Sequence, residues 1–213
     1  MLITFEGPDG SGKTTQMALL ADTLAGQGHS LIRVREPGGT NIGEQIRGVL
    51  HQIDNREMQP RAEVLLYSAA RAQLVEEVIR PALDEGKIVL CDRFYDSTFA
   101  YQGYGHGLDT EALRRLTAFA TGGLKPDLTI YIDIAPEEGL KRRQRDGKAE
   151  WNRLDALGLD FHKRVHAGYQ QLIADEPGRW VKVDGDRAVE DIQADIWRII
   201  AERIPAPPAK GRQ

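Results

Sequence analysis

The chain has 213 residues, of which 41% are hydrophobic and 28% charged, and its formal net charge is −4 at pH 7. This length and apolar content fit one domain that buries a hydrophobic core. The acidic balance argues against a general nucleic-acid binder, which would be strongly basic.

Cysteine content and hydropathy indicate where the protein works. Cys91 is the single cysteine and lies inside an apolar run, as expected of a small buried side chain in a reducing compartment. The N-terminus enters the apolar run LITF without a charged leader, and nowhere do eighteen apolar residues follow one another. We therefore predict a cytoplasmic protein without a membrane partner.

Short apolar runs alternate with longer segments of helical pattern along the chain. The runs predict strands at 2–7, 31–36, 87–93, 128–134 and 180–185. The segments between and after them predict helices at about 13–26, 41–50, 61–85, 110–121, 136–145, 157–176 and 187–203. Strands separated by helices indicate an α/β fold with a mostly parallel sheet covered on both faces. Pro81 predicts a kink or interruption near the end of the helix at 61–85.

The domain is expected to span residues 1–204. The last nine residues, 205–213, are too rich in proline for a helix and too polar to pack, so we expect a flexible tail.

The first strand is followed by GPDGSGKT, residues 7–14, which has the P-loop spacing G-x-x-x-x-G-K-S/T. The glycines let backbone N–H groups converge on phosphate oxygens at the positive end of the next helix. Lys13 supplies a charge to the outer phosphates and Thr14 offers a hydroxyl to Mg²⁺. A turn that merely joins strand to helix is the alternative, and the strand–turn–helix context disfavours it. The predicted ATP-binding residues are Gly7, Pro8, Asp9, Gly10, Ser11, Gly12, Lys13, Thr14 and Thr15.

The third strand ends in CDRF, with Asp92 and Arg93 at the edge of the sheet where ligands bind in open α/β folds. Asp92 can hold Mg²⁺ through water, and Arg93 can contact a phosphate with two N–H groups. A surface ion pair is the alternative. No guanine-reading Asn-Lys-x-Asp motif and no D-x-x-G switch occurs in a suitable place, so a GTPase is disfavoured.

A basic cluster, KRRQRDGK, occupies residues 141–148, and Arg153 follows it. Such a run can be only a solvated helix face. Phosphoryl transfer, however, needs arginines that arrive when water is excluded. The position after the fourth strand therefore predicts a mobile lid at about 141–153.

Four blocks in order resemble the thymidylate kinase family, in its bacterial type with arginines in the lid. They are FEGPDGSGKTTQ (5–16), REPGGTNIGEQIR (35–47), AEVLLYSAARAQLV (62–75) and DRFYDSTFAYQGYGHG (92–107), and KPDLTIYIDI (125–134) follows. The resemblance spans Leu2 to about Tyr169. It implies a five-stranded parallel P-loop NTPase fold, ATP and Mg²⁺, transfer of the γ-phosphoryl group to dTMP, and a homodimer.

The resemblance also implies an acceptor site. Asp9 would meet the 3′-OH of dTMP, and Tyr101 would crowd a ribose 2′-OH. Tyr67 and Arg71 are four residues apart on one helix face and would address the base. A turn-stabilising aspartate and a rim tyrosine beside a surface arginine are the alternatives at these positions. The full acceptor set is Asp9, Glu36, Pro37, Arg47, Tyr67, Arg71, Arg93, Ser97, Thr98, Tyr101 and Gln102.

Catalysis would require no general base, because the phosphate of dTMP is already mostly ionised at neutral pH. Lys13, Arg93 and the lid would position the groups and neutralise charge, with Mg²⁺ held at Thr14 and Asp92. Ser11 in the P-loop carries no positive charge, so the lid must supply it. Arg143 and Arg153 are the predicted lid residues, while Arg142 and Arg145 stay open as alternatives because WNRLD (151–155) departs from the pattern of many relatives.

Two other functions remain compatible with the motifs at this point. The chain could be another nucleoside monophosphate or deoxynucleoside kinase, which acceptor preference would reveal. It could also be a P-loop switch, which would retain nucleotide and transfer nothing. The acceptor-site blocks argue against a switch.

Overall fold

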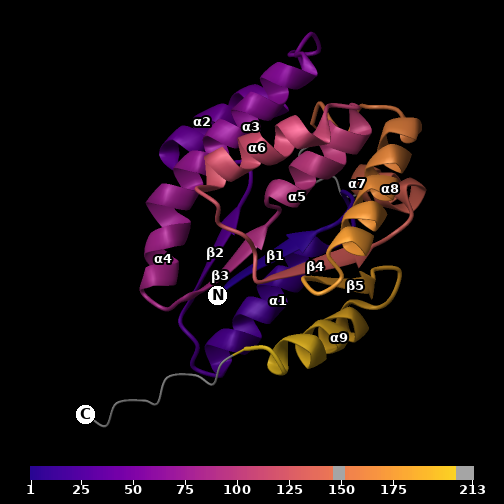
Figure 1. The fold of residues 1–213 in the computed structure, drawn as a ribbon. Helices are drawn as coiled ribbons and strands as arrows, with labels where there is room; N and C mark the ends of the chain where they lie inside the picture. The colour runs from indigo at the N-terminus through magenta and orange to yellow at the C-terminus, as the bar shows by residue number, and fades with distance from the viewer. Residues whose placement is uncertain (146–151, 205–213) are drawn as a thin grey trace.

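A parallel five-stranded sheet forms the centre of the molecule (Figure 1), with strand order β2-β3-β1-β4-β5. This computed structural model describes residues 1–145 and 152–204, so the expected tail and the middle of the expected lid lie outside the described residues. The strands are β1 (Leu2–Glu6), β2 (Leu31–Arg35), β3 (Ile88–Asp92), β4 (Leu128–Asp133) and β5 (Trp180–Asp184).

The described α-helices are α1 (Lys13–Gly26), α2 (Asn41–His51), α3 (Pro60–Leu74), α4 (Arg80–Asp84), α5 (Tyr95–Thr98), α6 (Thr110–Thr121), α7 (Pro136–Arg145), α8 (Leu159–Asp175) and α9 (Val189–Ala201). Two π-helical segments, η1 (Val75–Ile79) and η2 (Phe99–Gly105), complete the fold. Among the described residues, no helix has both the length and the apolarity needed to cross a membrane.

Helices cover both faces of the sheet because successive strand residues point to opposite sides. On one face, Ile3 and Phe5 of β1 pack in a cluster with Leu20 of α1 and Ile196 of α9, and these two helices lie together on one side of the sheet in Figure 1. On the other face, one cluster joins β1 and β3 to α3 and α6, and another joins β4 and β5 to η2 and α8. The α/β prediction is confirmed.

The carboxyl ends of the central strands meet at one edge of the sheet. β1 pairs in parallel with β3 on one side and with β4 on the other, so the order of connection reverses beside β1. Ligands bind in open α/β sheets at such a point. The P-loop after β1 and the Asp92–Arg93 turn after β3 both lie there.

The helix expected at 61–85 is interrupted just before Pro81, as predicted. A π-helical turn, η1, precedes Pro81, and the backbone N–H of Arg80 donates to the carbonyl of Val75. Proline has no N–H and its ring crowds the carbonyl four residues earlier. A wider turn just before Pro81 accommodates both effects, so the chain continues as α4.

The segment after β3 was not predicted as a helix and is one. It forms α5 and then η2, and all residues of η2 except Tyr104 are buried. Its aromatic and small residues lack a clear 3.6-residue apolar stripe, because the segment is buried on several sides at once. This segment carries four of the predicted acceptor residues.

Candidate active site

The P-loop requires glycine at particular positions. Gly7, Gly10 and Gly12 all have positive φ angles, of 143°, 78° and 91°, which side chains disfavour. A Cβ would lie 2.4 Å from the carbonyl oxygen of Ile132 at Gly7, and 2.4 Å from that of Gly139 at Gly10. Helix α1 then begins at Lys13 without a side-chain cap. Its first backbone N–H groups are therefore oriented to bind an anion.

Lys13 lies within this loop rather than in solvent. Its Nζ donates to the carbonyl oxygens of Gly7 at 3.1 Å and Pro8 at 2.8 Å, and 6% of the residue is exposed. Burial, with the nearby charge of Arg93, lowers the pKa of Lys13 to about 8. A bound polyphosphate would favour the charged form further, because an opposite charge nearby raises the pKa of a lysine.

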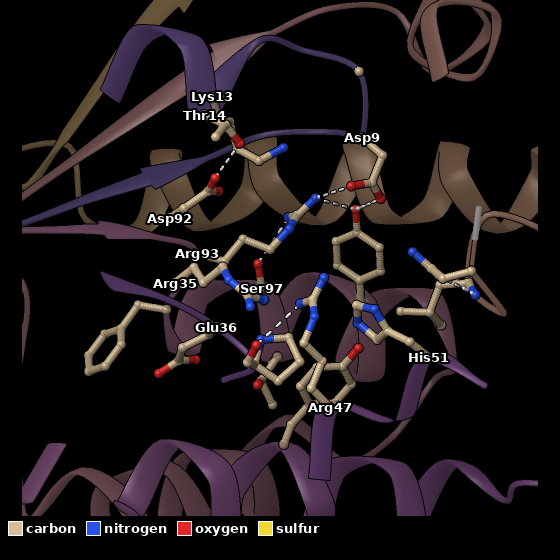
Figure 2. Close-up of a pocket in the computed structure, with 18 of the residues that line it drawn as sticks. Asp9, Lys13, Thr14, Arg35, Glu36, Arg47, His51, Asp92, Arg93 and Ser97 are labelled. Carbon is tan, nitrogen blue, oxygen red and sulfur yellow. Dashed lines mark hydrogen bonds and ion pairs between the residues drawn. The ribbon is translucent and has the colours of Figure 1, made fainter. Parts of the chain in front are cut away.

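Thr14, in the first turn of α1, contacts Asp92, at the end of β3. The Oγ1 of Thr14 donates to the Oδ2 of Asp92 at 2.5 Å, as Figure 2 shows. A hydroxyl beside a carboxylate, next to the phosphate loop, is the donor set that P-loop kinases use for Mg²⁺ together with phosphate oxygens. Among the described residues there is no cluster of three or more His, Cys, Asp or Glu that could hold a metal without a nucleotide.

Arg93 is the centre of a polar network across the cavity. Its Nη2 donates to Asp9 Oδ1 at 2.8 Å and to the Tyr101 hydroxyl at 3.1 Å. Its Nη1 donates to Ser97 Oγ at 3.1 Å and to the Tyr169 hydroxyl at 3.3 Å. Arg93 alone among the described non-glycine residues has a positive φ, of 67°. Such strain persists where the surrounding structure holds it, often at functional sites.

Glu6, at the end of β1, stabilises the turn that contains Arg93. Its carboxylate accepts hydrogen bonds from the Phe94 backbone N–H at 2.8 Å, from Ser97 Oγ at 2.7 Å and from the Tyr169 hydroxyl at 2.8 Å. Burial raises the pKa of Glu6 to about 7, although Arg93, 3.8 Å away, opposes the shift. Sequence reasoning missed this residue, because an acid that ends a strand gives no sign of what it contacts.

One cavity of about 430 Å³ joins these groups to the acceptor side (Figure 2). Eighteen predicted site residues line it: Asp9, Gly10, Gly12, Lys13, Thr14, Thr15, Glu36, Pro37, Arg47, Tyr67, Arg71, Asp92, Arg93, Ser97, Thr98, Tyr101, Gln102 and Arg143. Four predicted residues do not line it: Gly7, Pro8, Ser11 and Arg153. Gly7, Pro8 and Ser11 are buried within the P-loop itself.

Arg71 lies buried in the wall of the cavity. Its Nε donates to Glu36 Oε2 at 2.8 Å, its Nη1 to Thr98 Oγ1 at 3.0 Å and its Nη2 to the Phe94 carbonyl at 3.4 Å. Glu36, predicted as a residue of the acceptor site, is paired with Arg71 in this structure. Arg71 reaches Glu36 because α3 places it directly beside the loop after β2.

Arg47 approaches the same loop from α2, where its Nη1 donates to the carbonyl of Pro37 at 3.2 Å. His51, one turn later on α2, also lines the cavity, and burial lowers its pKa to about 4. The four-residue spacing from Arg47 was the signal that could have identified His51.

The lid arginines occupy different places. Arg143 on α7 lines the cavity and its Nη2 lies 3.1 Å from Asp155 Oδ2. Arg142 also lines it and is paired with Glu138. Arg153 differs from the expectation, because its buried guanidinium is paired with the carboxylate of Glu63 on α3. A buried acid needs a cationic partner, and Arg153 supplies it here.

Comparisons with known proteins agree with this geometry. A family model described as thymidylate kinase matches residues 5–196. A thymidylate kinase from Roseiflexus sp. strain RS-1 is 52% identical over 210 residues, covering 94% of this chain and 93% of that protein. One from Bacillus licheniformis is 48% identical over 204 residues, covering 96% of each. The crystal structure of thymidylate kinase from Ehrlichia chaffeensis superposes with a TM-score of 0.77 at 31% identity, covering 94% of this chain and 98% of that one. The chain therefore belongs to the thymidylate kinase family, the P-loop kinases that use ATP to phosphorylate dTMP.

Proposed function

We propose that this cavity of about 430 Å³ holds both substrates of this kinase, with ATP phosphates at the P-loop and dTMP between α3 and η2. The observation that carries the assignment is the continuity of the cavity from Lys13 and Thr14 to Tyr67 and Gln102. A nucleotide switch would not need the part of the cavity beside Tyr67 and Gln102, because it binds no second nucleotide. Positioning two substrates in one dry site is the main source of rate in phosphoryl transfer.

On the acceptor side, each part of dTMP has a matching group. The Tyr67 ring and the Gln102 carboxamide would address the base, with Arg71 at its O4. Asp9 and Tyr101 would hold the sugar. Arg47 and Arg93 would neutralise the phosphate, and the remaining predicted residues, Glu36, Pro37, Ser97 and Thr98, would shape and support the pocket.

We propose that the basic segment at 141–153 is the lid, and that Arg143 reaches the transferring phosphoryl group. Arg143 already lines the cavity from α7. For Arg153 to act there, its pair with Glu63 would have to open, so we assign Arg153 a role in holding the lid end. A cytoplasmic location and the lack of a nucleic-acid partner stay predictions.

Mg²⁺ would be held by Thr14 and Asp92 together with the ATP phosphates. When bound, the ion neutralises charge that develops during transfer. Thr14 would offer its hydroxyl oxygen, and Asp92 would orient the ion or its water.

Asp92→Asn is expected to raise the Mg²⁺ concentration for half-maximal activity by about tenfold, because outer-shell partners typically change metal affinity by ~10–100-fold. The measurement is dTMP phosphorylation against Mg²⁺ at fixed ATP. Asp184→Asn is the matched control, since Asp184 also ends a parallel strand, but β5 lies at the edge of the sheet. If both variants keep the parental Mg²⁺ requirement, Asp92 is not part of the metal site.

We also propose a homodimer formed through α3 and α6. Leu65 on α3 and Phe119 on α6 are large apolar side chains that are 57% and 87% exposed. Neighbouring α2 adds Ile42 and Val49, which are 50% and 46% exposed. Exposed apolar side chains gathered on adjacent helices indicate an interaction surface.

Phe119→Asp is expected to shift the protein from dimer to monomer, because it places a charge at the most exposed apolar side chain of this surface. Sedimentation velocity at micromolar concentration measures the change. Val189→Asp serves as the control, since Val189 is 43% exposed on α9, across the sheet. A parent protein that sediments as a monomer would contradict the proposal.

A further inference from the structure

Glu63 is a buried acid that lies behind the acceptor pocket rather than in it. It is 0% exposed in the first turn of α3 and does not line the cavity. Its Oε1 accepts a hydrogen bond from Gln102 Nε2 at 2.7 Å, and its other oxygen is paired with Arg153. His106 Nε2 lies 3.4 Å from Oε1. A carboxylate with this many partners is held in one orientation.

We propose that Glu63 is a positioning residue that sets base selectivity, by fixing the Gln102 carboxamide with its oxygen available to the base of dTMP. The inference deepens the proposed function and rests on Gln102 lying beside that base. Arg153, at the end of the lid segment, completes the arrangement as the charge partner of Glu63.

The orientation of Gln102 follows from the chemistry of its partner. Burial alone would raise the pKa of Glu63, but its hydrogen-bond donors and the charge of Arg153 outweigh burial and lower it. An ionised carboxylate only accepts hydrogen bonds, so the carboxamide must present its NH₂ to Glu63. The described residues donate no hydrogen bond to Gln102 Oε1. The oxygen is therefore the end of the carboxamide that remains for a ligand.

A fixed acceptor distinguishes pyrimidine bases. Thymine and uracil carry an N–H at ring position 3, whereas cytosine has a lone pair there. Gln102 Oε1 would accept from the N–H and face the lone pair of cytosine unfavourably. Sites built around a required hydrogen bond reject analogues that lack it much more strongly than apolar pockets reject a size change. If the carboxamide could rotate, its NH₂ would serve cytosine and this discrimination would weaken.

The test is Glu63→Gln, which keeps the shape and removes the acceptor-only property. Its own amide can offer either end to Gln102. We expect the ratio of kcat/KM for dTMP over dCMP to fall by roughly tenfold, the scale of one hydrogen bond to a charged group. The ratio of dTMP over dUMP should stay unchanged, because both bases carry the same N–H. The KM for ATP should stay within about twofold of the parent, since Glu63 does not line the cavity.

Glu77→Gln is a matched control. Gln73 Nε2 donates to Glu77 Oε2 at 2.7 Å, so the same type of pair is removed, but on an exposed face of the same helical run. It should leave all acceptor ratios unchanged. An equal loss of dTMP and dCMP turnover in Glu63→Gln would show a purely structural role and overturn the proposal.

A double-mutant cycle with Gln102→Leu separates the inference from the proposed function. If Glu63 acts through Gln102, then Glu63→Gln should not change the dTMP over dCMP ratio further when Gln102 is already leucine. Additive effects would overturn the inference alone. If Gln102→Leu leaves the KM for dTMP unchanged, the placement of Gln102 beside the base is wrong and the proposed acceptor assignment fails as well.

A second measurement uses the unaltered protein and does not depend on folding of the Glu63 variant. The side-chain NH₂ of Gln102, assigned by its loss in Gln102→Leu, should exchange slowly with solvent and move little when dTMP binds. An NH₂ signal that exchanges freely and shifts strongly with dTMP would place the NH₂ against the base and overturn the proposal.

Discussion

Lys13→Met is expected to lower kcat for dTMP phosphorylation by about a thousandfold, because loss of one preorganised donor to developing charge costs ~10²–10³-fold. Lys13 is the charge closest to the start of α1 and lies in the cavity wall beside Thr14. Methionine fills a similar volume but cannot neutralise the transferring group. The measurement is the steady-state rate of ADP formation at saturating ATP and dTMP.

The same substitution should not lower the melting temperature, which separates lost chemistry from lost folding. Burial disfavours the charged form of Lys13 and lowers its pKa to about 8, so an apolar replacement relieves a desolvation cost. Lys87→Met, at a surface lysine paired with Glu85 before β3, should keep the parental kcat. A Lys13→Met enzyme that retains a tenth or more of parental kcat would contradict the role given to Lys13.

Arg93→Lys is expected to reduce kcat/KM for dTMP by roughly a hundredfold, although the charge is kept. The guanidinium holds Asp9 and Tyr101 with one nitrogen and Ser97 with the other. A lysine ammonium is a point charge and cannot reproduce that planar fork. Misplacement of the acceptor phosphate by about 1 Å can cost ~10²-fold. Initial rates against dTMP concentration give kcat and KM separately.

Arg93→Lys tests the side chain alone, because lysine must adopt the same backbone angle as arginine. The positive φ at position 93, 67°, is a burden for either side chain. Arg198→Lys is the control, since Arg198 is 74% exposed and paired with Asp195 on α9. If Arg93→Lys matches the parent in kcat/KM, charge alone suffices and the network described for Arg93 does not position dTMP.

The phosphate loop and the sheet could be predicted because both depend on neighbours in the chain. The glycines at 7, 10 and 12 stand where the backbone must take positive φ. The strands follow from apolar runs, and residues such as Leu2 and Ile3 pack in different clusters on opposite faces. The motifs and the family resemblance together identified eighteen residues that line the cavity. Their assigned roles stay predictions.

The segment between β3 and α6 shows where sequence patterns were insufficient. Its residues were recognised through resemblance, but neither α5 nor η2 was predicted. Burial against α8 and α3 imposes the helical path there, and a surface in contact on several sides leaves no single apolar stripe to detect.

The sequence by itself determined that the chain carries a P-loop at the end of a buried strand and belongs among parallel α/β kinases. Only the tertiary structure decided which carboxylate each arginine meets: Arg71 with Glu36, Arg93 with Asp9, and Arg153 with Glu63. The members of these pairs are 35, 84 and 90 residues apart in the chain. Their pairing depends on how the sheet and the covering helices bring buried charges together. The spacing of residues along the chain does not predict that arrangement.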